Sequence, residues 1–325
     1  MINAHVGLTY ACNMNCEHCY VKGKKHKAVK TNSDILLNRL ECLGTFYITY
    51  TMGETLLWSG FYDFARKANK KGFYQILLSN GSTIQSEEVV RRLTAAGIKK
   101  VGISIDSSEP SKHDKNRNFS GAYQLANNAI RLLAAEPQVW LQVAMTIGNH
   151  NLCEVPLVIE NMKMLGVTSF SFLWLRENGT IAPIDNIYQY EEIMKMLILM
   201  HNAGAVDINV HDYRMNYIVN SLYTDGQITQ ETRQDFLNMN SCHALSDLIL
   251  VDPSGDMYAC NFADKPFANI YTSELEEIAE YQFSGQVSVE LTAHFIHCGN
   301  ASQRLGPCTN HGLPFQRFQI VLKVQ

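Results

Sequence analysis

The sequence lacks the features that mark proteins of membranes, secretion pathways and nucleic acids. No apolar segment reaches the length needed to span a bilayer, and no basic region followed by an apolar stretch opens the chain. The formal net charge is -4 and no sustained run of Lys or Arg occurs, which disfavours a surface that neutralises phosphates. We therefore expect a cytoplasmic protein with neither a membrane nor a nucleic-acid partner.

Charged residues are few and apolar residues are many. They make up 18% and 46% of the 325 residues, so the chain can bury a large core as one or two domains. The nine cysteines are an odd number in a chain too long to need disulfides, and a reducing compartment would keep their thiols available for metals. Seven of them form two groups, which are Cys12, Cys16 and Cys19 near the start and Cys242, Cys260, Cys298 and Cys308 near the end.

A helical pattern, a glycine and a short apolar run alternate through the first two thirds of the chain. The glycines that precede the runs are Gly44, Gly72, Gly97, Gly166 and Gly204. Glycine just past a helix supplies a left-handed cap, and β-branched or aromatic runs suit buried strands. With VGLTY at the start and VWLQVAMTI at 139–147, we expect about six or seven parallel strands. The expected helices include Ser33–Leu43, Ser86–Ala96 and Gly121–Ala134.

The α/β pattern favours either an open parallel sheet or a partial or full barrel, with chemistry on loops at the carboxyl ends of the strands. The rhythm changes after about residue 225. The stretch LILVDPSGDMYAC reads as two strands joined by a Pro-Ser-Gly-Asp turn, which predicts a hairpin. We therefore divide the chain into residues 1–225 and a smaller second domain, 226–325, with a polar linker or helix around TDGQITQETRQDF.

Two kinds of metal site fit the spacing of Cys12, Cys16 and Cys19, which follow directly on the first strand. Zinc could take the three thiolates together with His18 or His5. A four-iron, four-sulfur (4Fe-4S) cluster could instead take the three thiolates and leave one iron open. An open iron can chelate S-adenosylmethionine (SAM) and pass an electron to it. On spacing alone, both alternatives and coincidence stay open.

The segment ACNMNCEHCY resembles the cluster loop of the radical SAM superfamily, and the resemblance continues through TMGE at 51–54, LLSNG at 77–81, GISID at 102–106 and HDKNR at 113–117. It implies a partial (βα)6 barrel, a catalytic 4Fe-4S cluster on the three cysteines and bound SAM. The SAM contacts that it implies are Met52, Gly53, Glu54, Ser79, Asn80, Ser104, Asp106, Arg117 and Leu173. The chain departs from the family pattern where Met52 replaces a glycine, Thr55 a proline and Ser107 a glycine.

The second cysteine group resembles the short "twitch" form of the SPASM extension found in the same superfamily. That resemblance implies one auxiliary 4Fe-4S cluster on Cys242, Cys260, Cys298 and Cys308, and structural zinc is the competing interpretation. The auxiliary cluster would store or pass electrons. Cys153 is a weak candidate for a hydrogen-atom donor, and a packing role is the simpler interpretation.

The resemblance implies an oxidoreductase that cleaves SAM reductively to a 5′-deoxyadenosyl radical, which abstracts hydrogen from a substrate carbon. Maturation of a ribosomal peptide by cross-linking, oxidation or epimerisation is the expected outcome. A dehydrogenase or epimerase acting on a small carbohydrate alcohol is the alternative, and a zinc-binding scaffold is the alternative from another class. A flavodoxin or ferredoxin is the expected electron donor. The cysteine group starts twelve residues from Met1, so a separate protein could supply leader-peptide recognition.

Overall fold

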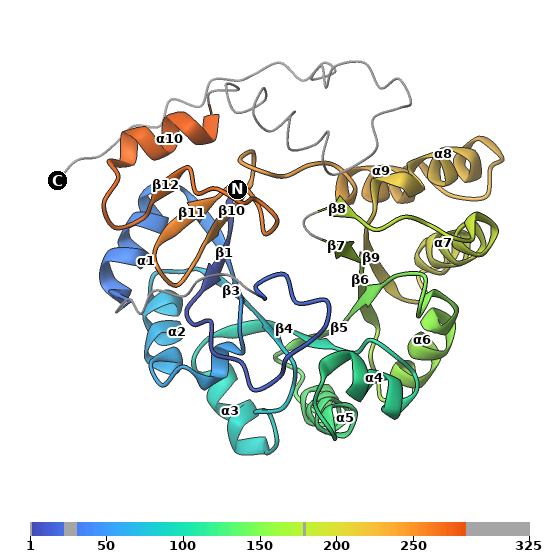
Figure 1. Cartoon of the computed structure of the whole chain (residues 1–325), viewed down its shortest axis with the longest axis horizontal. Coiled ribbons are helices and arrows are strands. Elements are labelled where there is room, and N and C mark those ends of the chain that lie inside the picture. Colours follow the sequence, from blue (N-terminus) through green and yellow to red (C-terminus); the bar gives the residue numbers. More distant parts are fainter. Residues whose placement is uncertain (1, 23–30, 178–179, 284–325) are drawn as a thin grey trace.

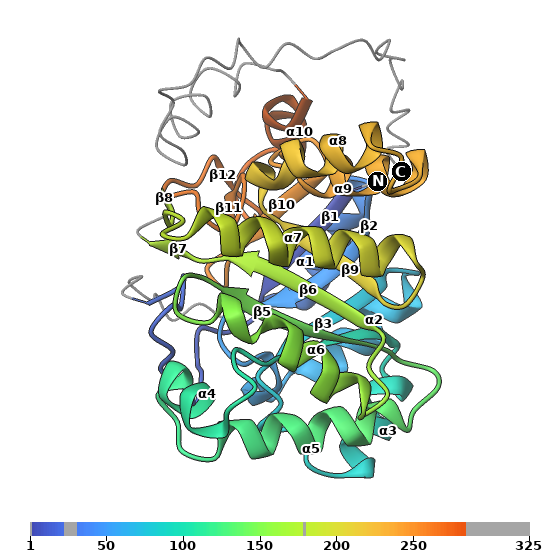
Figure 2. The same ribbon diagram turned by 90° about the vertical axis from the view of Figure 1, so that its right-hand side faces the viewer.

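The computed structural model describes residues 2–22, 31–177 and 180–283 of the chain (Figure 1). Its centre is a curved sheet with helices on the outer face, which Figure 2 shows from the side. The parallel strands of this sheet are β1 (Ile2–Gly7), β2 (Thr45–Thr51), β3 (Tyr74–Ser79), β4 (Ile98–Ser104), β5 (Trp140–Ile147), β6 (Ser169–Trp174), β9 (Asp207–His211) and β10 (Leu248–Val251). No helix within the described residues is both long and apolar enough to cross a bilayer.

The order of neighbouring strands is β12-β11-β10-β1-β2-β3-β4-β5-β6-β9. Strands β11 (Asp256–Tyr258) and β12 (Ala268–Asn269) run antiparallel at one edge, and a separate small sheet pairs β7 (Arg176–Glu177) with β8 (Thr180–Ile181). Strands β1 to β6 are neighbours in chain order, as right-handed βα units require. The predicted α/β fold with a partial barrel is confirmed.

Helices lie between almost all of the parallel strands. They are α1 (Ser33–Cys42), α2 (Phe61–Lys70), α3 (Glu87–Ala95), α4 (Pro110–Arg117), α5 (Ala122–Ala134), α6 (Val155–Lys163), α7 (Ile187–Asn202), α8 (Asn216–Thr224), α9 (Gln230–Met239) and α10 (Leu275–Phe283). Three short 3-10 turns are η1 (Thr55–Leu57), η2 (Leu152–Glu154) and η3 (Tyr213–Met215). The five glycines predicted to cap helices all have positive φ, between 67° and 88°, so that prediction is confirmed.

The two faces of the sheet differ in burial along β3, and the inner face is the less covered one. Along β3, Gln75 and Leu77 are fully buried under the helices, while Ile76 and Leu78 on the other face are only half-buried. Gln75 is the polar exception under the helices, and its amide donates to the carbonyls of Ala65 and Ala96 at 3.1 and 3.2 Å. The apolar core therefore lies between sheet and helices rather than in the barrel interior.

Two predictions about strands need correction. The first strand was expected at VGLTY but begins at Ile2, because Ala4 and Val6 alternate as buried residues and pair with both neighbouring strands. The predicted hairpin is present as β10 and β11, but β10 also pairs in parallel with β1 and so extends the barrel sheet. The parallel strands therefore number eight among the described residues, against the expected six or seven. The linker candidate at 224–236 forms the turn after α8 and the first part of α9, and the domain boundary at residue 225 stays a prediction.

Gly81 tests how closely the end of β3 packs on its neighbours. Its φ is +80°, and a Cβ there would lie 3.0 Å from the Cα of Ala126 in α5. We expect Gly81→Ala to lower the free energy of unfolding by about 2 to 3 kcal/mol, since strain and overpacking add. Gly72→Ala is the control, because its φ is +85° but a Cβ would meet nothing within 4 Å. Urea unfolding that ranks the two variants equally would contradict this packing.

Candidate active site

The predicted cysteine group lies on residues 8–22, here called the cysteine loop, which follows β1 at the carboxyl edge of the sheet (Figure 1). The Cys12 side chain is exposed, and Cys16 and Cys19 are half-buried. The loop backbone is fastened to α4, because the amides of Asn15 and Glu17 donate to the carbonyls of Arg117 and Asn116 at 3.3 and 3.1 Å. The thiols are therefore presented on a loop that neighbouring elements hold in place.

The three thiols lie close enough to influence one another. Burial raises the pKa of Cys12 above its usual value, and the nearby charges of Cys16 and Cys19 raise it further, while the Met14 amide opposes the shift. Thiolates crowded together in this way are stabilised by a bound cation, and loading a metal would release their protons.

Hydrogen-bond donors point at two of the sulfurs. The Met14 amide and the Asn80 side-chain amide lie 3.4 and 3.9 Å from Cys12 Sγ, and Arg117 Nη1 lies 3.7 Å from Cys16 Sγ. Such donors stabilise thiolates, which is what an iron–sulfur cluster requires of its ligands. A cluster also spreads its thiolates over different irons, whereas zinc gathers its ligands on one ion. Among the described residues, no group of three or more His, Cys, Asp or Glu side chains is placed to hold a single metal ion.

The two histidines considered as zinc ligands have other partners. His18 Nε2 lies 3.6 Å from Asp106 Oδ2, and His5 Nδ1 lies 3.0 Å from Asn261 Oδ1. Burial lowers the pKa of both imidazoles. The donor set of the cysteine loop therefore fits a cluster held by three thiolates better than a zinc site completed by either histidine.

The turn after β2 presses its backbone against the cysteine loop. Met52 and Gly53 both have left-handed backbone, with φ of 64° and 53°. A Cβ on Gly53 would lie 2.5 Å from the carbonyl oxygen of Ala11, so only glycine fits there. The next amide, of Glu54, donates to that same carbonyl at 2.8 Å. The predicted SAM segment and the cysteine loop are thus in direct contact.

Glu54 joins the end of β2 to the end of β3. Its side chain is buried, and its carboxylate accepts from Ser79 Oγ and from the Asn80 amide, both at 2.9 Å. Burial raises the pKa of Glu54, while these two donors oppose the rise. Asn80 in turn donates to Asn13 Oδ1 in the cysteine loop at 3.0 Å. Four of the predicted SAM contacts, Gly53, Glu54, Ser79 and Asn80, therefore lie together beside the cysteines.

Asp106 and Arg117 form a second buried group at the loop. Arg117 Nε lies 2.7 Å from Asp106 Oδ2, and their side chains are 10% and 1% exposed. Burial alone would raise the pKa of Asp106, but Arg117, His18 and His113 outweigh it and hold that pKa below its usual value. Ser104 is the last residue of β4 and is half-buried. In the sequence it lies just before Asp106.

The remaining predicted residues lie farther along the sheet or beyond the described residues. Leu173 is half-buried on β6, paired with Thr146 and His211. Cys153 is exposed in η2 and is not among the residues that line the adjacent cavity. Cys242 is exposed and Cys260, just after β11, is half-buried. Cys298 and Cys308 lie outside the described residues, and the auxiliary site stays a prediction.

A cavity of about 1030 Å³ opens beside the cysteine loop. His18, Cys19 and Tyr20 form one wall, and the segments that follow β4, β5, β6 and β11 form the others. The guanidinium of Arg176 lies over the Phe262 ring at 4.5 Å. Sequence reasoning missed Phe262, and the only available signal was an aromatic residue two positions after Cys260. Pockets for single ligands span roughly 300 to 1,000 Å³, so the cavity is large enough for a ligand. Of the three cysteines only Cys19 lines it, and the predicted SAM contacts are not among its lining residues.

Comparison with known proteins decides the family. The model of the radical SAM superfamily matches residues 6–162, which include the cysteine loop and the ends of β2 to β5. This chain belongs to the radical SAM superfamily. The radical SAM barrel thus accounts for the position of the three cysteines, and the predicted family is confirmed.

Individual radical SAM relatives differ in how much of their length this chain matches. The AdoMet-dependent heme synthase of Methanosarcina barkeri is 23% identical over 84% of this chain and 80% of its own length. The sporulation killing factor maturation protein SkfB of Bacillus subtilis is 32% identical over 52% of this chain but only 41% of its own length. The chain therefore spans less than half of SkfB.

Among solved structures, Streptococcus suis SuiB bound to its precursor peptide SuiA gives a TM-score of 0.69 at 9% identity. That match covers 88% of this chain and 66% of SuiB. At this identity the likeness shows the shared fold alone. The chain is a radical SAM enzyme by its family, and the substrate is a separate question.

Glu54 provides a test of how the site is held together. Glu54→Ala removes the acceptor of Ser79 and of the Asn80 amide, so we expect the free energy of unfolding of the metal-free protein to fall by about 3 kcal/mol. Glu87→Ala is the control, because the Glu87 side chain is 80% exposed on α3, and its effect should stay within about 0.5 kcal/mol. Equal unfolding midpoints for the two variants would show that Glu54 does not join β2 to β3.

Proposed function

We propose that this radical SAM enzyme matures a peptide, by abstracting hydrogen from a carbon of a residue held in the cavity beside the cysteine loop. The observation that carries the proposal is the meeting of three thiols, the Gly53 turn and a cavity of about 1030 Å³ at one edge of the sheet. The similarity to SkfB, named as a maturation protein, and the fold shared with SuiB, solved with a precursor peptide, support a peptide as substrate.

Cys12, Cys16 and Cys19 would hold the catalytic 4Fe-4S cluster, and the segments Met52–Glu54 and Ser79–Asn80 would hold SAM beside it. When bound, the cluster supplies the electron that splits SAM into methionine and a 5′-deoxyadenosyl radical. The protein's own part is to orient SAM and to exclude water from it. Gly53 lets the backbone approach the loop closely, and the buried Glu54 fixes the two strand ends that flank SAM.

The substrate side of the cavity carries cations and an aromatic ring. Arg176 stacks on Phe262, and Lys112 is neutralised by Glu109 and Glu154, which lie 2.8 and 3.1 Å from its ammonium. An aromatic face and a guanidinium suit a peptide, whose carbonyls and side chains offer both acceptors and apolar surface. We also propose an auxiliary 4Fe-4S cluster on Cys242, Cys260, Cys298 and Cys308, which would accept the electron left on an oxidised product.

A second candidate substrate is a tetrapyrrole. The specific observation in its favour is that the similarity to the heme synthase of Methanosarcina barkeri covers 84% of this chain and 80% of that protein, whereas the similarity to SkfB covers 52% of this chain and 41% of SkfB. Both candidates use the same hydrogen abstraction, so one label experiment separates them.

The cysteine loop is tested first. Replacing Cys12, Cys16 and Cys19 together by alanine should abolish formation of 5′-deoxyadenosine under anaerobic reducing conditions, because no other site would bind SAM at an open iron. About half of the iron should remain, since the auxiliary site is separate. Circular dichroism should stay unchanged, because the loop lies outside the helices and strands. Continued cleavage of SAM by this variant would refute the assignment.

The substrate is tested with deuterium. Reduced enzyme and SAM are incubated separately with deuterated peptides, carboxylated tetrapyrroles and sugars, and 5′-deoxyadenosine is analysed by mass spectrometry. We expect the label to enter 5′-deoxyadenosine only with a peptide, together with a dehydrogenated or cross-linked product, because hydrogen abstraction precedes either outcome. Label transfer from a tetrapyrrole or a sugar alone would overturn the peptide proposal. A product of unchanged mass carrying solvent hydrogen would indicate epimerisation.

A further inference from the structure

The buried pair of Asp106 and Arg117 contacts the cysteine loop as well as the end of β4. Arg117 divides its guanidinium between two partners, with Nε 2.7 Å from Asp106 Oδ2 and Nη1 3.7 Å from Cys16 Sγ. The same residue's carbonyl accepts from the Asn15 amide of the cysteine loop at 3.3 Å. Side chain and backbone of Arg117 thus both contact the loop that carries the thiols.

Asp106 is held so that it can aim the guanidinium. Its Oδ1 accepts from the Thr146 amide of β5 at 3.3 Å, its carbonyl accepts from Asn151 at 2.9 Å, and its amide donates to His113 Nδ1 at 3.1 Å. The backbone of Asp106 is thus held on both sides, and the Thr146 amide holds its carboxylate. An arginine paired with a fixed carboxylate has its planar fork oriented as well.

We propose that Arg117 is a positioning residue that stabilises the Cys16 thiolate and thereby raises the reduction potential of the catalytic cluster, with Asp106 holding it in place. This inference rests on the proposed function. A positively charged donor beside a ligand sulfur favours the reduced cluster, which is the more negative form. Because the pair is buried, water screens that interaction weakly. This role differs from the SAM contact that the sequence predicted for Arg117.

The test is a redox titration of the reconstituted full-length protein without SAM. The catalytic cluster is recognised as the electron paramagnetic resonance signal that changes when SAM is added in a parallel sample. In the double variant Asp106→Asn, Arg117→Gln, which replaces the ion pair by two neutral amides, we expect the ratio of reduced to oxidised cluster at a fixed potential to fall about tenfold. That change corresponds to roughly 59 mV for a one-electron couple.

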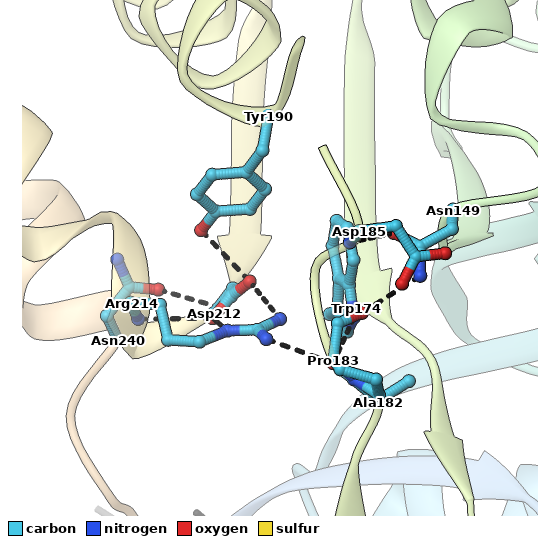
Figure 3. Close-up of polar contacts among 9 residues, drawn as sticks. All are labelled: Asn149, Trp174, Ala182, Pro183, Asp185, Tyr190, Asp212, Arg214 and Asn240. Atoms are coloured by element: carbon cyan, nitrogen blue, oxygen red, sulfur yellow. Dashed lines mark hydrogen bonds and ion pairs between the residues drawn. The ribbon is translucent and has the colours of Figure 1, made fainter. Parts of the chain in front are cut away.

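The chain offers a control in a second Asp–Arg ion pair, in which Asp212 is buried and Arg214 is half-buried. Arg214 Nη2 lies 2.9 Å from Asp212 Oδ2 just after β9, and the guanidinium lies 4.8 Å from the Trp174 ring (Figure 3). Arg214 Nη1 donates to the carbonyl of Ala182, and the Tyr190 hydroxyl donates to Asp212 Oδ2. The described partners of Arg214 include no cysteine. The double variant Asp212→Asn, Arg214→Gln should lose stability in the same way but leave the cluster potential unchanged.

The outcomes separate the two proposals. If the unmodified protein forms no SAM-responsive cluster, the proposed function fails. If it does, and the Arg117 variant keeps its iron and its SAM-free potential but binds SAM more weakly, Arg117 contacts only SAM and this inference is overturned. If the double variant fails to fold, the single variant Arg117→Gln decides, because it removes both the charge and the cationic donor beside Cys16 while the Thr146 amide still holds the Asp106 carboxylate. An unchanged potential in that variant also overturns the inference.

Discussion

The site depends on one buried carboxylate that ties three strand ends together. Glu54 follows β2, its amide binds the loop that follows β1, and its side chain accepts two hydrogen bonds from the end of β3. A buried carboxylate is tolerated only when its oxygens have donors. Because both donors come from the end of β3, the carboxylate fixes the position of the end of β2 relative to the end of β3. The Glu54 amide then fixes the position of the cysteine loop.

The distribution of polarity over the sheet explains why a cavity exists at all. The outer face is closed by helices, so the apolar core and most of the stability lie there. The inner face carries His5, Asn209 and His211 among its residues, which cannot pack as an apolar core does. An interior lined by such groups stays open to a ligand.

Features that depend on neighbouring residues in the sequence were predictable, and these make up most of the fold. Features that depend on contacts between distant residues were not. The helix caps at Gly44 and Gly166 follow from the ease with which glycine adopts positive φ. This is a local property, so the sequence indicates it directly. The pairing of β10 with β1 joins residues far apart in the sequence, so no local pattern indicates it. For the site, the spacing of Cys12, Cys16 and Cys19 indicated one loop. The aim of Arg117 at Cys16 depends on where α4 ends, at the left-handed Asn118, and could not be read from composition or spacing.

The departures from the family pattern are compensated by packing. Met52 has the left-handed backbone that glycine adopts without cost, and this costs roughly 1 to 2 kcal/mol in another residue. Its side chain is 3% exposed and packs with Val21 and Leu250 beside Cys19. Burying a side chain of this size contributes about 1.5 to 3 kcal/mol, which offsets the strain. Ser107, where the pattern predicts glycine, is fully buried and donates to Glu154. The turns thus owe their rigidity to side-chain contacts, and the apolar packing around Met52 shields one side of Cys19 from water while its other side faces the cavity.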